Sequence, residues 1–143
     1  MKNKLITVLI TSCLMSGVVL AGDNAHSNHN KAMTSELSLN NGDRWEMDDH
    51  TRKMASKMEE TFLGADHSTL ASLNAVGAQL EAQLDVLIEG CTMEGKAHEQ
   101  LHIFLTDYIP TVHNLAKAED HETAKNSAIK IKGELEAYKK HFK

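Results

Sequence analysis

Apolar residues recur every three or four positions in four segments of this chain, which are separated by short polar connections. This spacing places the apolar side chains of a segment on one face of an α-helix. The four segments cover residues 43–64, 68–91, 96–117 and 120–142. No alternation of apolar and polar residues, which would indicate a β-strand, competes with this pattern. The sequence therefore predicts an all-α protein.

The expected ends of these helices carry recognisable signals. Asp43 is a predicted N-cap for the first helix, with Glu46 three residues later completing a capping box. Gly64 is the predicted end of that helix, and Asp120 is the predicted N-cap of the fourth. Gly77 lies in the apolar stripe of the second helix, where a glycine costs helix stability. We therefore expect a neighbouring helix to approach closely at Gly77.

Four helices of about twenty residues joined by short loops are typical of an antiparallel up-down-up-down bundle. Short loops force each helix to run antiparallel to the preceding one. The start of the first and third helices and the end of the second and fourth should then share one end of the bundle. We assign residues 43–143 to this four-helix bundle.

The segments before the bundle have a different character. The chain begins with a basic stretch and continues with apolar residues to Ala21, which predicts a cleaved secretory signal peptide over residues 1–21. Processing as a lipoprotein at Cys13 is the alternative, because Ile-Thr-Ser-Cys resembles a lipoprotein cleavage box. Residues 22–42 are polar and poor in apolar side chains, so we expect a disordered, flexible N-terminal arm.

The net charge argues against some classes of binding partner. The formal charge of the chain is −5, and loss of the signal peptide removes only Lys2 and Lys4, which takes it to −7. Nucleic-acid binding requires a concentrated basic face, so an acidic exported domain is a poor candidate for it. A basic amphipathic face for anionic lipid is also missing. We therefore expect a soluble periplasmic protein with neither nucleic acid nor membrane as a partner after signal cleavage.

Residues 91–102 concentrate side chains that bind metals. Cys91 is the only cysteine left after the signal peptide, and Met93 follows it. His98 and His102 are four residues apart, so on a helix both lie on one face and can reach the same ion. Thiol or thioether sulfur together with imidazole suits copper or zinc better than magnesium or calcium.

The expected bundle brings one further histidine to the same end. His50 lies early in the first helix, so the predicted metal site consists of His50, Cys91, Met93, His98 and His102. Met47 is a further sulfur ligand candidate, and Asp48 or Asp49 could orient an imidazole. The alternative is a turn with a buried cysteine and two histidines on the surface.

The last thirteen residues, Ile-Lys-Gly-Glu-Leu-Glu-Ala-Tyr-Lys-Lys-His-Phe-Lys, resemble periplasmic cytochrome b562. A weaker likeness covers the first two helices. The resemblance implies a four-helix bundle in the periplasm that binds haem b. It also implies a methionine ligand near the start of the first helix and a histidine ligand near the end of the last. The first of these positions falls near Met47 or His50, and the second falls at Lys139, two residues before His141, so Met47 or His50 together with His141 are the candidate haem ligands.

These observations support three functional hypotheses. The first is a soluble periplasmic protein that binds copper, or zinc, as a carrier, buffer or tolerance factor and exchanges the ion with a periplasmic redox or metal-trafficking protein. The alternative is a cytochrome b562-like electron carrier, and the third is an interaction module in which Cys91 links two chains into a homodimer. We expect no hydrolase or transferase activity, because the sequence contains no glycine-rich phosphate loop, nucleophile elbow or His-Glu-x-x-His motif.

Overall fold

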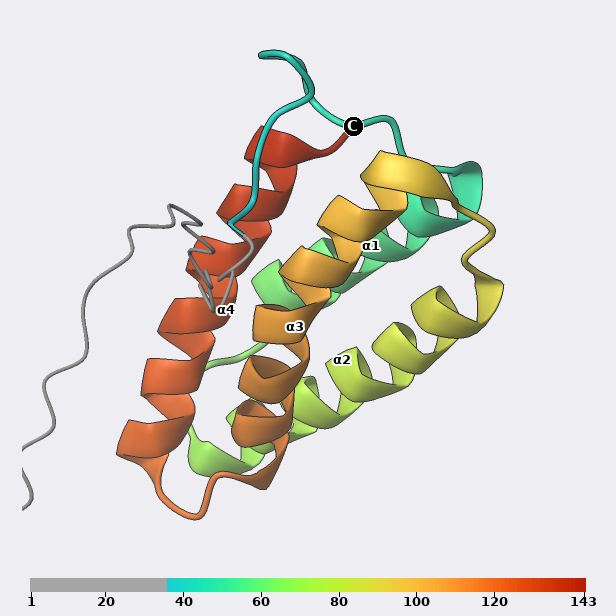
Figure 1. Ribbon diagram of the computed structural model, residues 1–143. Coiled ribbons are helices and arrows are strands. Elements are labelled where there is room, and N and C mark those ends of the chain that lie inside the picture. The colour runs from blue at the N-terminus through green and yellow to red at the C-terminus, as the bar shows by residue number, and fades with distance from the viewer. Residues whose placement is uncertain (1–35) are drawn as a thin grey trace, which may run out of the picture. The chain divides into compact units, whose positions relative to one another are not determined.

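A computed structural model describes residues 36–143, and this part of the chain is built from four α-helices (Figure 1). The helices are α1 (Asp49–Leu63), α2 (Leu70–Gly90), α3 (Gly95–Lys117) and α4 (His121–His141). Over these residues the backbone forms only isolated bridges outside the helices. The prediction of an all-α protein is therefore confirmed for the described part. The predicted signal peptide and most of the predicted arm lie outside it.

Side-chain caps set the starts of three of the four helices. Asp120 accepts a hydrogen bond from the backbone nitrogen of Thr123 at 2.8 Å, which confirms the predicted cap of α4. Gly64 is the C-cap of α1, also as predicted. Thr69 and Ser72 form a capping box at the start of α2, so this helix begins two residues later than the expected Ser68. Each such cap satisfies a backbone donor that the helix itself leaves unpaired.

The predicted start of the first helix is wrong. Asp48, and not Asp43, is the N-cap of α1. Residues 45–47 are extended and pair with residues 141–143: the nitrogen of Trp45 donates to the carbonyl of His141 at 2.7 Å, and the nitrogen of Met47 donates to the carbonyl of Lys143 at 2.8 Å. A helix that began at Asp43 would need the nitrogen of Met47 for a bond within the helix. This nitrogen bonds to Lys143 instead, so the helix begins later.

Buried apolar side chains from all four helices form one core. A Leu or Ile side chain that is fully removed from water contributes about 1.5–3 kcal/mol to stability. The largest fully buried apolar side chains are Leu73, Leu80, Leu101, Tyr108, Val112, Leu115, Ile131 and Phe142. Met47 also belongs to this core. It precedes α1 and lies in the extended segment, and its side chain is buried among the core residues.

Helices α2 and α3 pack closely, as expected from Gly77. A Cβ atom at this position would lie 2.4 Å from the backbone nitrogen of Ala116. Asn74 reinforces the contact by donating to the carbonyl of Ala118 at 3.1 Å. The glycine therefore allows the two backbones to approach, and the prediction is confirmed.

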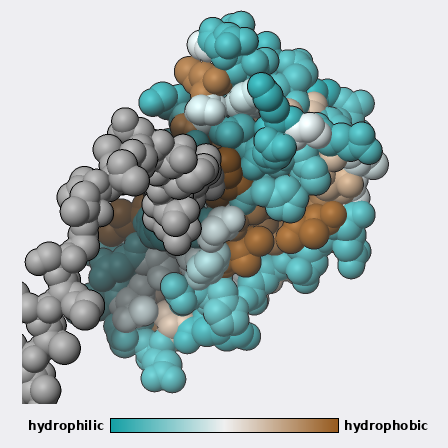
Figure 2. Space-filling view, in the orientation of Figure 1, coloured by the Kyte–Doolittle hydropathy of each residue, from teal (hydrophilic) through white to brown (hydrophobic). Residues whose placement is uncertain are grey.

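The backbones of α1 and α4 stay further apart than those of α1 and α2, α2 and α3, or α3 and α4. An ion pair between Lys139 of α4 and Glu59 of α1, at 2.9 Å, joins the two helices. The face of the molecule seen in Figure 2 is largely hydrophilic, with an apolar region over α2 and α3. None of the four helices is long and apolar enough to cross a membrane.

Candidate functional site

Two histidines on the first turns of α3 face each other. The Nε2 atoms of His98 and His102 are 3.0 Å apart, and their ring centroids are 4.4 Å apart. In the absence of a metal, one Nε2 carries hydrogen and donates to the other. Two nitrogens bound to one tetrahedral ion are about 3.3 Å apart, given metal–nitrogen bonds of about 2.0–2.1 Å. The pair is therefore within a few tenths of an ångström of the spacing that a shared ion requires.

The loop before α3 carries the two sulfur residues. Cys91 is the C-cap of α2, and Cys91 and Met93 are both half-buried against the core. Gly95 follows with φ of 70°, a left-handed backbone conformation that favours glycine, and α3 begins there. The loop thus leads directly from the sulfur side chains to the first turn of α3, on which His98 lies.

Asp48 fixes this loop to the start of α1. One carboxylate oxygen accepts from the nitrogen of Thr51 at 2.7 Å and caps α1. The other accepts from the nitrogen of Thr92 at 3.1 Å and from its hydroxyl at 2.9 Å. Partial burial raises the pKa of Asp48, but the bonds from Thr51 and Thr92 outweigh it and hold the pKa well below its usual range. Asp48 is therefore ionised across the physiological pH range.

This role corrects the expectation that Asp48 or Asp49 orients an imidazole. Asp48 binds Thr92, and Asp49 pairs with Arg52 one turn later. Sequence reasoning missed Thr92, although an N-cap aspartate has a second carboxylate oxygen left for a partner. The two residues are 44 positions apart, and no local pattern connects them.

His50 lies against the end of α2. Its Nε2 is 2.9 Å from the carbonyl oxygen of Val86, and because a carbonyl only accepts, this nitrogen carries hydrogen. The ring fills the space beside Gly90, where a Cβ atom would come within 2.2 Å of Nε2. His50 is thus held next to the residue that precedes Cys91, and Nδ1 is the nitrogen left for another ligand.

The two residues suggested by the cytochrome resemblance lie near the paired chain segments. Met47 is buried in the core, with 2% of its surface exposed. The Nδ1 atom of His141 donates to the carbonyl of Ala137 at 2.8 Å, so in the neutral ring Nε2 is free to bind a metal. The sulfur of methionine and the imidazole nitrogen of histidine are both known ligands of haem iron.

The nearby space between α1 and α4 is small. A groove of about 170 Å³ is lined there by residues that include Arg52, Leu135 and Tyr138. Burial raises the pKa of Tyr138 to about 12, so its hydroxyl stays neutral. Ligand pockets usually measure about 300–1,000 Å³. Haem binding at this groove would require α1 and α4 to move apart.

The structure thus brings some of the predicted site residues together. His98 and His102 form a pair, and His50 is placed at the end of α2. Within residues 36–143, no three His, Cys, Asp or Glu side chains gather into a group that could hold a metal ion.

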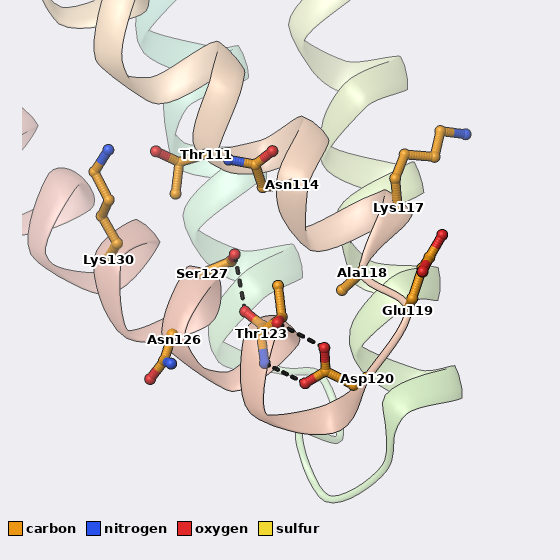
Figure 3. A pocket seen from close by; sticks show the side chains of 10 residues that line it. All are labelled: Thr111, Asn114, Lys117, Ala118, Glu119, Asp120, Thr123, Asn126, Ser127 and Lys130. Carbon is orange, nitrogen blue, oxygen red and sulfur yellow. Dashed lines mark hydrogen bonds between the residues drawn. The ribbon is translucent and has the colours of Figure 1, made fainter.

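A separate groove of about 690 Å³ lies between α3 and α4, near the loop that joins them (Figure 3). Three of its polar residues bind each other: Asp120 accepts from Thr123, and the hydroxyl of Ser127 donates to the carbonyl of Thr123 at 3.0 Å. The lining residues offer neither sulfur nor imidazole. This groove therefore lacks the ligand types that copper and zinc favour.

No protein-family model, no curated protein and no solved structure matches this chain.

Proposed function

We propose that this protein is a periplasmic copper-binding protein that carries, buffers or detoxifies the ion. In this proposal residues 1–21 are a signal peptide, and the four helices run as an antiparallel up-down-up-down bundle. The observation that carries the proposal is the 3.0 Å separation of the Nε2 atoms of His98 and His102. A metal ion can replace the proton that the two rings share.

The neighbouring sulfur residues favour copper over harder ions. Thioether and thiolate ligands select Cu(I), whereas carboxylate and water select magnesium or calcium. Met93 and Cys91 lie within a few residues of His98, in a loop that Asp48 holds against α1. Zinc, which accepts the same nitrogen and thiolate ligands, is the competing ion.

The exposure of the histidine pair suits exchange of the ion. His98 is half-buried and His102 is exposed, so an ion at the pair is reachable from solvent. A periplasmic redox or metal-trafficking protein could therefore bind at this end of the bundle and take the ion by ligand exchange. The proposal assigns no catalytic residue.

Titration of the mature chain with Cu(I), in competition with a chromophoric chelator, tests the proposal. We expect one tight ion per chain, and we expect His98→Ala and His102→Ala each to weaken binding more than tenfold. His121→Ala is the matched control, because His121 is an exposed histidine at the start of α4. If both variants of the pair bind Cu(I) as tightly as the parent, the proposed site is wrong.

Substitution of each sulfur residue tests whether Cys91 or Met93 is a further ligand of the copper ion. Cys91→Ser nearly keeps the size of the side chain but removes the thiolate, and Met93→Leu nearly keeps the volume but removes the thioether. We expect at least one of the two to weaken Cu(I) binding while leaving the unfolding free energy nearly unchanged. The proposal of a mixed sulfur and imidazole site fails if neither variant changes the affinity.

Haem-dependent electron transfer is the alternative function. The backbone bond from Met47 to Lys143 places this methionine beside the end of α4, which carries His141. Addition of haem to the mature chain should then produce a Soret band that His141→Ala shifts or abolishes. If the band does not appear, the alternative is excluded, and if His141→Ala leaves it unchanged, His141 is not the ligand.

Linkage of two chains through Cys91 is the third possibility from the sequence. Cys91 is a free cysteine that is half-buried at the end of α2, so part of its surface is accessible to a second chain. Non-reducing electrophoresis of the mature chain, with Cys91→Ser as control, separates this dimer from the monomer.

A further inference from the structure

An apolar groove lies between α1 and α4 near the end of α1. It has a volume of about 480 Å³, within the range of small-molecule sites. Its apolar lining comes from three helices and consists of Phe62, Leu63, Leu73, Ala128 and Ile129. The backbones of α1 and α4 stay further apart than those of the other helix pairs that are consecutive in the chain, which leaves room for the groove between them.

Two side chains at this groove are unusually exposed for their type. Leu63 and Ile129 each have 61% of their surface exposed, more than any other large apolar residue in residues 36–143. One belongs to α1 and the other to α4, so the two helices present apolar surface to the same space. Contiguous exposed apolar surface in a concave site is typical of a place where an apolar ligand binds.

Two lysines flank the apolar surface of α4. Lys125 precedes Ile129 by four residues and Lys132 follows it by three, so all three side chains lie on one face of the helix. Among the described residues neither lysine has an ion-pair partner. By contrast, Lys130 pairs with Glu134 and Lys139 pairs with Glu59.

No acidic residue lines the groove, and two nearby aspartates accept hydrogen bonds from residues close to them in sequence. Asp66 accepts from the nitrogen and the hydroxyl of Ser68, and Asp120 accepts from those of Thr123. His67 and His121 also line the groove, each beside one of these aspartates. The lining of the groove thus contains two lysines and no carboxylate, so the carboxylate of a ligand would meet positive charge there.

We propose that this groove binds a free medium-chain fatty acid. The alkyl chain would lie along Phe62, Leu63 and Ile129, and the carboxylate would bind Lys125 or Lys132. Burial of each methylene group favours the complex, and the lysine charge selects a carboxylate over a neutral head group. The groove and the histidine pair share no residue, so this proposal does not depend on copper binding.

Calorimetric titration of the mature chain with decanoate, below the concentration at which it forms micelles, tests the proposal. We expect one decanoate per chain and at least fivefold weaker binding of decanol, which has the same chain length but no charge. Lys125→Ala with Lys132→Ala should weaken decanoate binding at least fivefold and leave decanol binding unchanged. Lys130→Ala, a paired lysine on the same helix, is the control.

Ile129→Gln tests the apolar part of the site. The residue is largely exposed, so the variant should fold, and we expect decanoate binding to weaken at least tenfold. Ile88→Gln is the matched control on the other side of the bundle, where Ile88 is 49% exposed. Decanoate binding that survives Ile129→Gln, equal affinity for decanol, or binding to anionic phospholipid vesicles without binding of decanoate would each overturn the proposal.

Discussion

Asp48 organises the candidate metal site without being one of its proposed ligands. Its two carboxylate oxygens join the first turn of α1 to Thr92, which lies between the two sulfur residues. Removal of the carboxylate would release both contacts at once. The residue therefore couples the stability of a helix end to the position of the loop.

We expect Asp48→Ala to lower the free energy of unfolding by about 1–2 kcal/mol, the usual cost of losing an N-cap. Asp120→Ala, which removes a cap with only local partners, is the control. Urea denaturation measures both. Only Asp48→Ala should also change the amide signals of residues 91–93 in nuclear magnetic resonance spectra. Equal effects of both variants on this loop would contradict the assigned role.

The charge of Asp48 also predicts a pH dependence. Because its pKa is lower in the folded protein, its ionised form stabilises the fold above the unfolded pKa of about 3.9. That contribution is lost as the pH falls through the folded pKa. Asp48→Asn should therefore be less stable than the parent at pH 7, and the difference should shrink as the pH falls below about 4. A difference that is constant with pH would exclude this electrostatic contribution.

Gly90 gives a second prediction at the residue scale. A methyl group at this position would collide with the ring of His50, so Gly90→Ala should break the bond from His50 to Val86 and destabilise the fold by about 1–2 kcal/mol. Gly133→Ala is the matched control: no atom outside its own helix lies near an added Cβ, so it should stabilise α4 by about 0.5–1 kcal/mol. Urea denaturation and the imidazole signals of His50 measure the two effects.

The residue types of the site could be predicted from the sequence, but several contacts could not. The four-residue spacing of His98 and His102 was sufficient to place them on one face, because helix geometry is local. The contacts of His50 with Val86 and of Asp48 with Thr92 join residues 36 and 44 positions apart. They depend on how the helices dock, which residue spacing does not specify.

At the scale of the elements, apolar spacing located all four helices, and capping residues located several of their ends. The start of α1 was wrong because Met47 fits helical spacing and also fits an extended segment with one side chain in the core. The backbone nitrogens of Trp45 and Met47 donate to carbonyls of residues 141–143, which follow the last helix. Backbone pairing between distant segments cannot be predicted from the local spacing of apolar residues.

The close packing of α2 and α3 should make Gly77 sensitive to substitution. A Cβ atom there meets backbone atoms of Leu115 and Ala116, which cannot rotate away. We expect Gly77→Ala to lower the free energy of unfolding by about 1–3 kcal/mol, despite the better helix propensity of alanine. Chemical denaturation measures the change, and Gly133→Ala again controls for propensity alone. A stabilising effect of Gly77→Ala would show that the helices are not tightly apposed.

For the whole molecule, the core and the paired end segments determine stability. Phe142 is 1% exposed and contacts the ring of Phe104 with centroids 6.1 Å apart. Phe142→Ala should therefore lower the free energy of unfolding by about 3–5 kcal/mol. Ile109→Ala, at a side chain that is 39% exposed, should have a much smaller effect. The fluorescence of Trp45, the single tryptophan, reports unfolding in both variants.

The pairing of residues 45–47 with 141–143 has a consequence for biosynthesis. The extended segment that leads into Asp48 acquires its backbone partners only after residues 141–143 have been synthesised. A nascent chain therefore cannot complete the end of the bundle that carries the histidine pair until all four helices have left the ribosome.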